Sequence, residues 1–297
     1  MGLKKLLTIT LTMCVALFSV INVFADSEEN SDASEVVTKN LLTGKETTAK
    51  VTDIHAYMEE NGASTYSYEG TGEIIEQAPR TVFPPDDRIE LSYSQRTAFP
   101  ARAIAYLRMT FPDSSSTYSG TGFMIGENIM ATCGHCVYDH DLGGWAETIE
   151  VIPATNGTSR PYGITYVTNM TTYNGWINSA LEPYDIAVCQ LETDMGNTTG
   201  WFGLKAQTDS YTGSYAYLAG YPGEPRLLRA YGEITFSNAD YLQYQIDMEG
   251  GQSGSPLYKY NSEYGWQAIG VNRGEASTFN RAVRITKNHF DFLLDTY

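Results

Sequence analysis

Short runs of alternating apolar and polar residues dominate the chain from about Arg96 onward, and glycine, asparagine or proline separates one run from the next. An alternation with a period of two places the apolar side chains on one face of a β-strand. Residues 121–125 and 129–131, joined by a turn at 126–128, therefore predict a β-hairpin. The same pattern predicts further strands at 148–152, 163–167, 186–191, 215–219, 227–236, 242–247, 255–258, 267–271 and 282–285.

These strands fall into two groups, which a stretch rich in glycine, asparagine and threonine at 195–200 separates. After the last strand, Thr286 is a suitable N-cap for a helix whose apolar residues recur at helical spacing. Two groups of about six strands and a terminal helix predict an all-β fold of two six-stranded antiparallel barrels. The expected barrels cover about 81–194 and 195–297.

The first part of the chain has a different composition. Lys4 and Lys5 precede an apolar run at 6–24, and small or apolar residues precede a cleavage position after Ala25. This pattern predicts a signal peptide at 1–25. Residues 26–80 are polar and acidic, too polar in their first half to build a core of their own, and predict a propeptide; a disordered linker is the alternative. A short helix is expected over 51–61, and the mature domain over 81–297.

Charge and cysteine content narrow the functional classes. The net charge of −16 argues against nucleic acid or anionic membranes as partners, because both bind basic surfaces. From the signal peptide we expect a secreted, extracellular protein with no membrane association after the signal is removed, and we expect it to be a monomer. Three cysteines then remain, so at most one internal disulfide can form. Cys133 and Cys136 lack a second cysteine or histidine pair, and we expect buried structural thiols, with no metal and no cofactor.

One short segment carries the candidate chemistry. Ser253 lies between glycines in the sequence GGQSGSP at 250–256, in a turn that exposes its hydroxyl. A serine hydroxyl is a weak nucleophile unless a base accepts its proton. His135, in the sequence ATCGHC, is the candidate base, and Asp185 lies between the two in the chain. The order His, Asp, Ser is that of chymotrypsin-type proteases, whereas α/β-hydrolases have the order Ser, acid, His.

The ordered set of motifs over 81–297 resembles the bacterial glutamyl endopeptidases, a family of chymotrypsin-fold serine proteases. The motifs that carry this resemblance are DDR at 86–88, GTGF at 120–123, the histidine block at 131–138, YD at 184–185, GWFG at 200–203 and QSGSP at 252–256.

The resemblance implies a role for each residue. Ser253 would attack the scissile carbonyl of a polypeptide substrate, His135 would accept the serine proton, and Asp185 would orient the imidazole. The N–H groups of Gly251 and Ser253 would form the oxyanion hole. The substrate would pair as an added strand along Val271, Asn272 and Arg273. Cleavage would follow Glu or Asp.

Activation by proteolysis is also implied. Trypsin-like enzymes place an aspartate before the nucleophile to pair with the new amino terminus, but Gln252 occupies that position here. Glutamyl endopeptidases instead use the freed amino terminus near the specificity pocket. Cleavage after Arg80 would therefore place the charged terminus of Thr81 where it favours an acidic substrate.

The specificity residues depart from the family. The family's histidine on the strand after the nucleophile corresponds to Asn272, which can donate a hydrogen bond but carries no charge. Arg273 could replace that charge if it points inward. An alternative is that Asp247, six residues before Ser253, selects Arg or Lys as in trypsin and permits self-maturation at Arg80. Asp247 could equally be the end of a strand.

Two other classes of function remain as alternatives. A non-catalytic relative could use the same cleft to bind peptides, although the complete triad argues against this. An esterase on another fold is disfavoured by the residue order.

Overall fold

A computed structural model of the chain describes residues 33–51, 62–70, 88–275 and 279–295. The predicted signal peptide, Thr81 and all but the first residue of the helix expected over 51–61 lie outside the described residues. Within the described ranges, no helix is long and apolar enough to cross a membrane.

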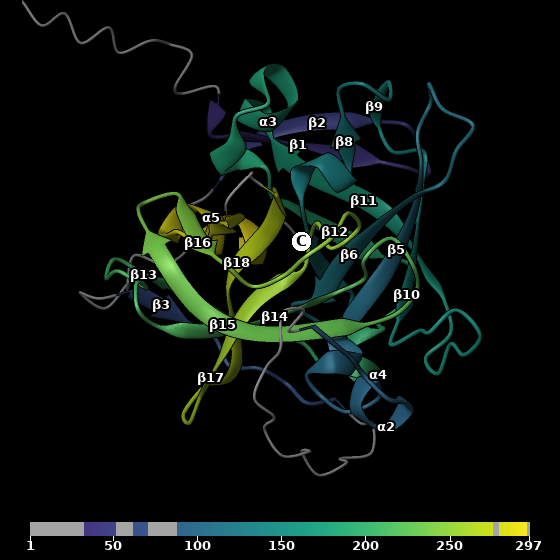
Figure 1. The fold of residues 1–297 in the computed structure, drawn as a ribbon. Helices are drawn as coiled ribbons and strands as arrows, with labels where there is room; N and C mark the ends of the chain where they lie inside the picture. The colour runs from purple at the N-terminus through teal and green to yellow at the C-terminus, as the bar shows by residue number, and fades with distance from the viewer. Residues whose placement is uncertain (1–32, 52–61, 71–87, 276–278, 296–297) are drawn as a thin grey trace, which may run out of the picture.

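The first barrel is a closed antiparallel sheet in the order β10-β5-β6-β7-β12-β11, which a second pairing between β10 and β11 completes (Figure 1). Its strands are β5 (Ile104–Thr110), β6 (Tyr118–Met124), β7 (Ile129–Thr132), β10 (Thr148–Pro153), β11 (Thr165–Tyr173) and β12 (Ala187–Leu191). The predicted hairpin corresponds to β6 and β7 and is confirmed. Strand β5 was not predicted, and β11 extends further toward the C-terminus than expected.

The second barrel has the order β17-β14-β15-β16-β19-β18 and closes by pairing β17 with β18. Its strands are β14 (Tyr215–Gly220), β15 (Leu228–Ser237), β16 (Tyr241–Tyr244), β17 (Pro256–Asn261), β18 (Gly265–Glu275) and β19 (Asn280–Arg284). The final helix, α5 (Lys287–Asp295), follows as predicted. The all-β fold of two six-stranded antiparallel barrels with a C-terminal helix is therefore confirmed.

Short elements connect these strands. They are β4 (Ile89–Glu90), which pairs with β15, the hairpin β8 (Tyr138–Asp139) and β9 (Gly144–Trp145), and the helices α2 (Tyr93–Arg96), α3 (Asn174–Ser179) and α4 (Gly196–Thr199). Helix α4 occupies the stretch expected to separate the barrels. It is followed by β13 (Gly203–Gln207), an unpredicted strand that pairs in parallel with β18.

The segment predicted as a propeptide adds strands to both barrels. Strand β1 (Glu35–Asn40) pairs with β11, β2 (Glu46–Lys50) pairs with β1, and β3 (Gly62–Ser64) pairs with β13. In Figure 1, the purple β1–β2 hairpin lies beside β11. Val36 is buried in the core of the first barrel. The described strands of this segment are thus held by backbone pairing with the barrels.

Aromatic side chains join the two barrels. Phe202, in the connection between them, packs against Phe123 of β6 and Tyr258 of β17, with ring centroids 5.7 and 5.1 Å apart. All three side chains are fully or almost fully buried. Burial of each such ring contributes about 1.5–3 kcal/mol relative to exposure. These contacts make Phe202 part of a core that both barrels share.

Candidate active site

Strand pairing in the first barrel brings His135 and Asp185 together. His135 lies on the 3₁₀ helix Gly134–Cys136, directly after β7. Asp185 ends the 3₁₀ helix Glu182–Tyr184, just before β12. Strands β7 and β12 are neighbours, with Thr132 opposite Ala187 in the register. A residue just after one strand and a residue just before its antiparallel neighbour lie at the same end of the sheet.

The contact between the two residues is a strong hydrogen-bonded pair. Nδ1 of His135 lies 2.9 and 3.1 Å from the two carboxylate oxygens of Asp185. The backbone N–H of His135 also donates to Oδ1 at 2.8 Å. Asp185 is fully buried, and Nε of Arg273 donates to its Oδ2 at 3.2 Å. The buried carboxylate is therefore hydrogen-bonded on both oxygens, as a buried charge requires.

Electrostatics favour the charged form of each partner. Burial is the largest single influence and lowers the pKa of His135, but the charges of Asp185 and Cys136 and the Asp185 hydrogen bond together outweigh it and raise the pKa to about 9. Burial raises the pKa of Asp185, but the His135 charge and hydrogen bond and the Arg273 charge lower it below its usual value. Asp185 is therefore a carboxylate whether the His135 imidazole is neutral or protonated, and its charge stabilises the protonated imidazole.

Two glycines shape the turn that presents Ser253. Gly251 has φ of 96° and Gly254 has φ of 87°, values that side-chain-bearing residues rarely adopt. A Cβ on Gly251 would lie 2.2 Å from the backbone nitrogen of Gly223, and a Cβ on Gly254 would lie 1.9 Å from the backbone oxygen of Thr121. Only glycine fits at either position. Ser253 itself is partly exposed, and its hydroxyl donates to the Arg273 carbonyl at 3.5 Å.

Thr121 of β6 connects this turn to the first barrel. Its backbone N–H donates to the Ser253 carbonyl at 2.8 Å, and its hydroxyl donates to the Gly251 carbonyl at 3.0 Å. The same hydroxyl accepts from the Tyr221 N–H at 3.0 Å. Sequence reasoning missed this role. A threonine on a strand position that faces the interior is the signal that could have indicated it, because a buried hydroxyl needs partners.

The side chain of Asn272, one of the predicted substrate contacts, lies in the interior. Asn272 is fully buried, its Oδ1 accepts from the Tyr244 hydroxyl, and its Nδ2 donates to the Gln252 carbonyl at 2.7 Å. The Gly254 N–H also donates to its carbonyl at 2.7 Å. The amide thus holds the nucleophile turn, and both of its polar ends are engaged within the protein.

Arg273 and Val271 have similar internal contacts. The Arg273 guanidinium forms ion pairs with Asp185 and Glu182, at 3.2 and 3.1 Å. The positive charge of Arg273 is therefore paired with these two carboxylates inside the protein. Val271 is fully buried and lies opposite Val283 in the register of β18 and β19. Asp247 is half-buried in the segment between β16 and the nucleophile turn.

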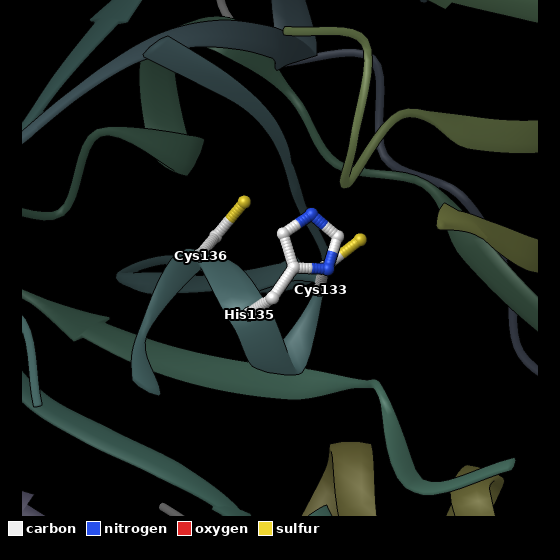
Figure 2. Close-up of side chains that lie close together, drawn as sticks. All are labelled: Cys133, His135 and Cys136. Atoms are coloured by element: carbon white, nitrogen blue, oxygen red, sulfur yellow. The ribbon is translucent and has the colours of Figure 1, made fainter. Parts of the chain in front are cut away.

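Two thiols lie beside His135. Cys133 and Cys136 are free and buried, as is Cys189. A ligand atom from each of Cys133, His135 and Cys136 lies within 4.8 Å of the others (Figure 2). A hydrogen bond with Cys133 lowers the pKa of Cys136 to about 7 against the effect of burial, whereas burial raises that of Cys133. Among the described residues, these three side chains are the group that could hold a metal ion.

Comparison with known proteins identifies the family. A trypsin-like peptidase domain matches residues 120–271. The "Extracellular metalloprotease" of Bacillus subtilis is 32% identical over 291 residues, covering 94% of this chain and 92% of the relative. The "Glutamyl endopeptidase" of Bacillus licheniformis is 35% identical over 273 residues, covering 84% of each chain.

A solved structure of a Glu endopeptidase in complex with MPD superposes with a TM-score of 0.62 at 27% identity, over 72% of this chain and 97% of that one. Its agreement with the two-barrel fold and the domain match confirm the resemblance to glutamyl endopeptidases. The chain is thus a serine endopeptidase that belongs to the trypsin-like peptidase family.

Proposed function

We propose that this serine endopeptidase is secreted and cleaves polypeptides after Glu or Asp, with Ser253, His135 and Asp185 as its catalytic triad. The observation that carries the triad is the buried Asp185 carboxylate, 2.9 Å from Nδ1 of His135. This pairing leaves Nε2 of His135 as the nitrogen able to accept a proton from serine. The histidine turn also contacts the Ser253 turn, because the Cys136 thiol donates to the Ser253 carbonyl at 3.9 Å.

The proposed reaction uses these residues in the roles of a serine-protease triad. Nε2 of His135 takes the Ser253 proton as Oγ attacks the scissile carbonyl, and Asp185 stabilises the imidazolium that forms. The N–H groups of Gly251 and Ser253 stabilise the oxyanion, each by about 3–4 kcal/mol. The imidazolium then protonates the leaving amine, and water hydrolyses the acyl-enzyme by the same steps in reverse. Arg273 has a positioning role, because its Nε donates to Oδ2 of Asp185, the oxygen that also lies 2.9 Å from Nδ1 of His135.

Specificity for acidic residues is supported by the glutamyl endopeptidases among the relatives. The side chains of Asn272 and Arg273 are engaged inside the protein, so a different group must meet the substrate carboxylate. In this proposal it is the freed amino terminus of Thr81, after removal of residues 26–80. Asp247 supports the opposite preference, because a carboxylate in the pocket would bind Arg or Lys.

A set of fluorogenic peptides that differ only before the scissile bond tests the proposal. The enzyme recovered after expression of the full chain should cleave the Glu and Asp peptides and leave the Arg and Lys peptides intact. The Ser253→Ala variant should be inactive. Ser255→Ala is the matched control, because the buried Ser255 hydroxyl lacks a hydrogen-bond partner among the described residues. Turnover of only the Arg and Lys peptides would assign specificity to Asp247, and equal activity of Ser253→Ala would refute the triad.

A further inference from the structure

The Cys133-Gly134-His135-Cys136 turn places three metal-binding side chains around one point. The 3₁₀ helix Gly134–Cys136 follows β7 directly, and its tight winding brings the two thiols and the imidazole to the same side of the backbone. Their ligand atoms all lie within 4.8 Å of one another. In a tetrahedral zinc site with Zn–S bonds of about 2.3 Å, two sulfurs are about 3.8 Å apart. The separation of the donor atoms is therefore on the scale of a zinc site.

We propose that Cys133, His135 and Cys136 form an inhibitory binding site for a soft divalent cation such as Zn²⁺ or Cd²⁺. Two thiolates and an imidazole are the donor set that such ions prefer, and three protein ligands leave a fourth position for water. Binding releases one proton from each thiol, and the two thiolate charges balance the divalent ion. The site rests on this geometry alone, whereas its inhibitory effect rests on the proposed function.

The burial of the donors defines how an ion reaches them. The Cys133 and Cys136 side chains are essentially inaccessible to solvent, whereas the His135 side chain is 28% exposed. An ion therefore meets the imidazole first and the thiols after it. Asp185, which bonds to His135 at 2.9 Å, brings a negative charge next to the group, and the Arg273 guanidinium, 3.2 Å from the same carboxylate, offsets part of it.

Metal binding and proteolysis are incompatible at His135, whichever nitrogen coordinates. A metal on Nε2 removes the proton acceptor that Ser253 needs, and a metal on Nδ1 removes the hydrogen bond to Asp185. Deprotonation of Cys133 also removes its hydrogen bond to the carbonyl of Asn272, at 2.9 Å, which links the histidine turn to β18. The ion therefore inhibits the enzyme, and a chelator should raise activity.

Cobalt(II) spectroscopy tests the site without any measurement of activity. The full chain carrying Ser253→Ala, reduced and treated with chelator, is titrated with cobalt(II). We expect one equivalent to produce a thiolate-to-cobalt charge-transfer band and the visible bands of tetrahedral cobalt. Loss of a group that only hydrogen-bonds to a metal ligand weakens metal affinity about 10–100-fold. Cys133→Ala and Cys136→Ala each remove a ligand itself, so each should weaken cobalt affinity by at least about tenfold. Cys189→Ala is the matched control, because Cys189 is equally buried and lies outside the group.

Several results would overturn the site. They are the absence of these bands, equal loss of affinity in Cys189→Ala, or a Cys133–Cys136 disulfide in the secreted protein, detected by mass spectrometry after alkylation. If a cysteine variant does not fold, His135→Ala on the Ser253→Ala background tests the same ligand set at a partly exposed position. It should also weaken cobalt binding by at least about tenfold.

The inhibitory effect is measured separately on the enzyme with Ser253 intact. Zn²⁺ should inhibit peptide cleavage in both the unsubstituted enzyme and Cys189→Ala, and chelator should restore it. Cleavage that persists at Zn²⁺ concentrations that displace bound cobalt would overturn the inhibition. If the chelator-treated enzyme cleaves no peptide, the proposed function fails, and the cobalt bands still decide the site.

Discussion

Replacement of Thr121 by valine should weaken both the fold and the catalytic turn. Valine has nearly the same shape as threonine but lacks the hydroxyl that contacts Gly251 and Tyr221, each at 3.0 Å. Thr121 is fully buried, so water cannot take the place of the lost hydroxyl group. An unsatisfied buried group costs about 1–3 kcal/mol, and two such groups lower the free energy of unfolding by about 2–6 kcal/mol.

The same change should lower kcat more than it alters KM, because Gly251 belongs to the proposed oxyanion hole. A displacement of about 1 Å in a catalytic group costs on the order of 100-fold in rate. Stability is measured by urea unfolding on the Ser253→Ala background, which prevents self-digestion, and kcat on the enzyme with Ser253.

Two control variants separate the hydroxyl from other effects. Thr121→Ser keeps the hydroxyl and should lose only about 1 kcal/mol with the methyl group. Thr110→Val removes an exposed hydroxyl from a contact with Thr148 and should stay within about 0.5 kcal/mol of the unsubstituted protein. If Thr121→Val matches the unsubstituted protein in stability and kcat, or if Thr121→Ser is equally damaging, the reasoning is wrong.

Two further predictions concern the ion pair and the N-terminal segment. His135 must be neutral to accept a proton, so a pKa of about 9 predicts that kcat/KM rises with pH up to about 9 and is lost as pH falls. Asp185→Asn should shift the pH at which kcat/KM falls toward the usual histidine pKa, and it should lower kcat about 10⁴-fold. An unchanged pH profile would contradict the role of Asp185. Deletion of residues 26–80 should lower the yield of folded protein, because β11 loses its partner β1 and β13 loses its partner β3. Circular dichroism of the secreted product measures how much of it is folded. A full yield of folded protein would show that the barrels do not need these strands.

Much of the fold follows from local patterns in the sequence. The period-two alternation predicted the β6–β7 hairpin and most of the barrel strands, and the capping and spacing of the last residues predicted α5. Strands β5 and β13 were missed. Their selection depends on neighbours that are remote in the chain, because β-propensity reflects packing on a pleated surface. The N-terminal strands were missed for the same reason: the polar β1–β2 hairpin is ordered largely by pairing with β11.

The sequence by itself determined which chemical groups the chain has and their order: a serine between glycines, a histidine after a strand and an aspartate before another. Only the tertiary structure decided what each group contacts. The pairing of β7 with β12 joined His135 to Asp185, and the closure of the second barrel directed Arg273 and Asn272 inward, toward partners distant in the chain. Side-chain alternation is encoded locally, whereas contact partners depend on the register and closure of the whole sheet.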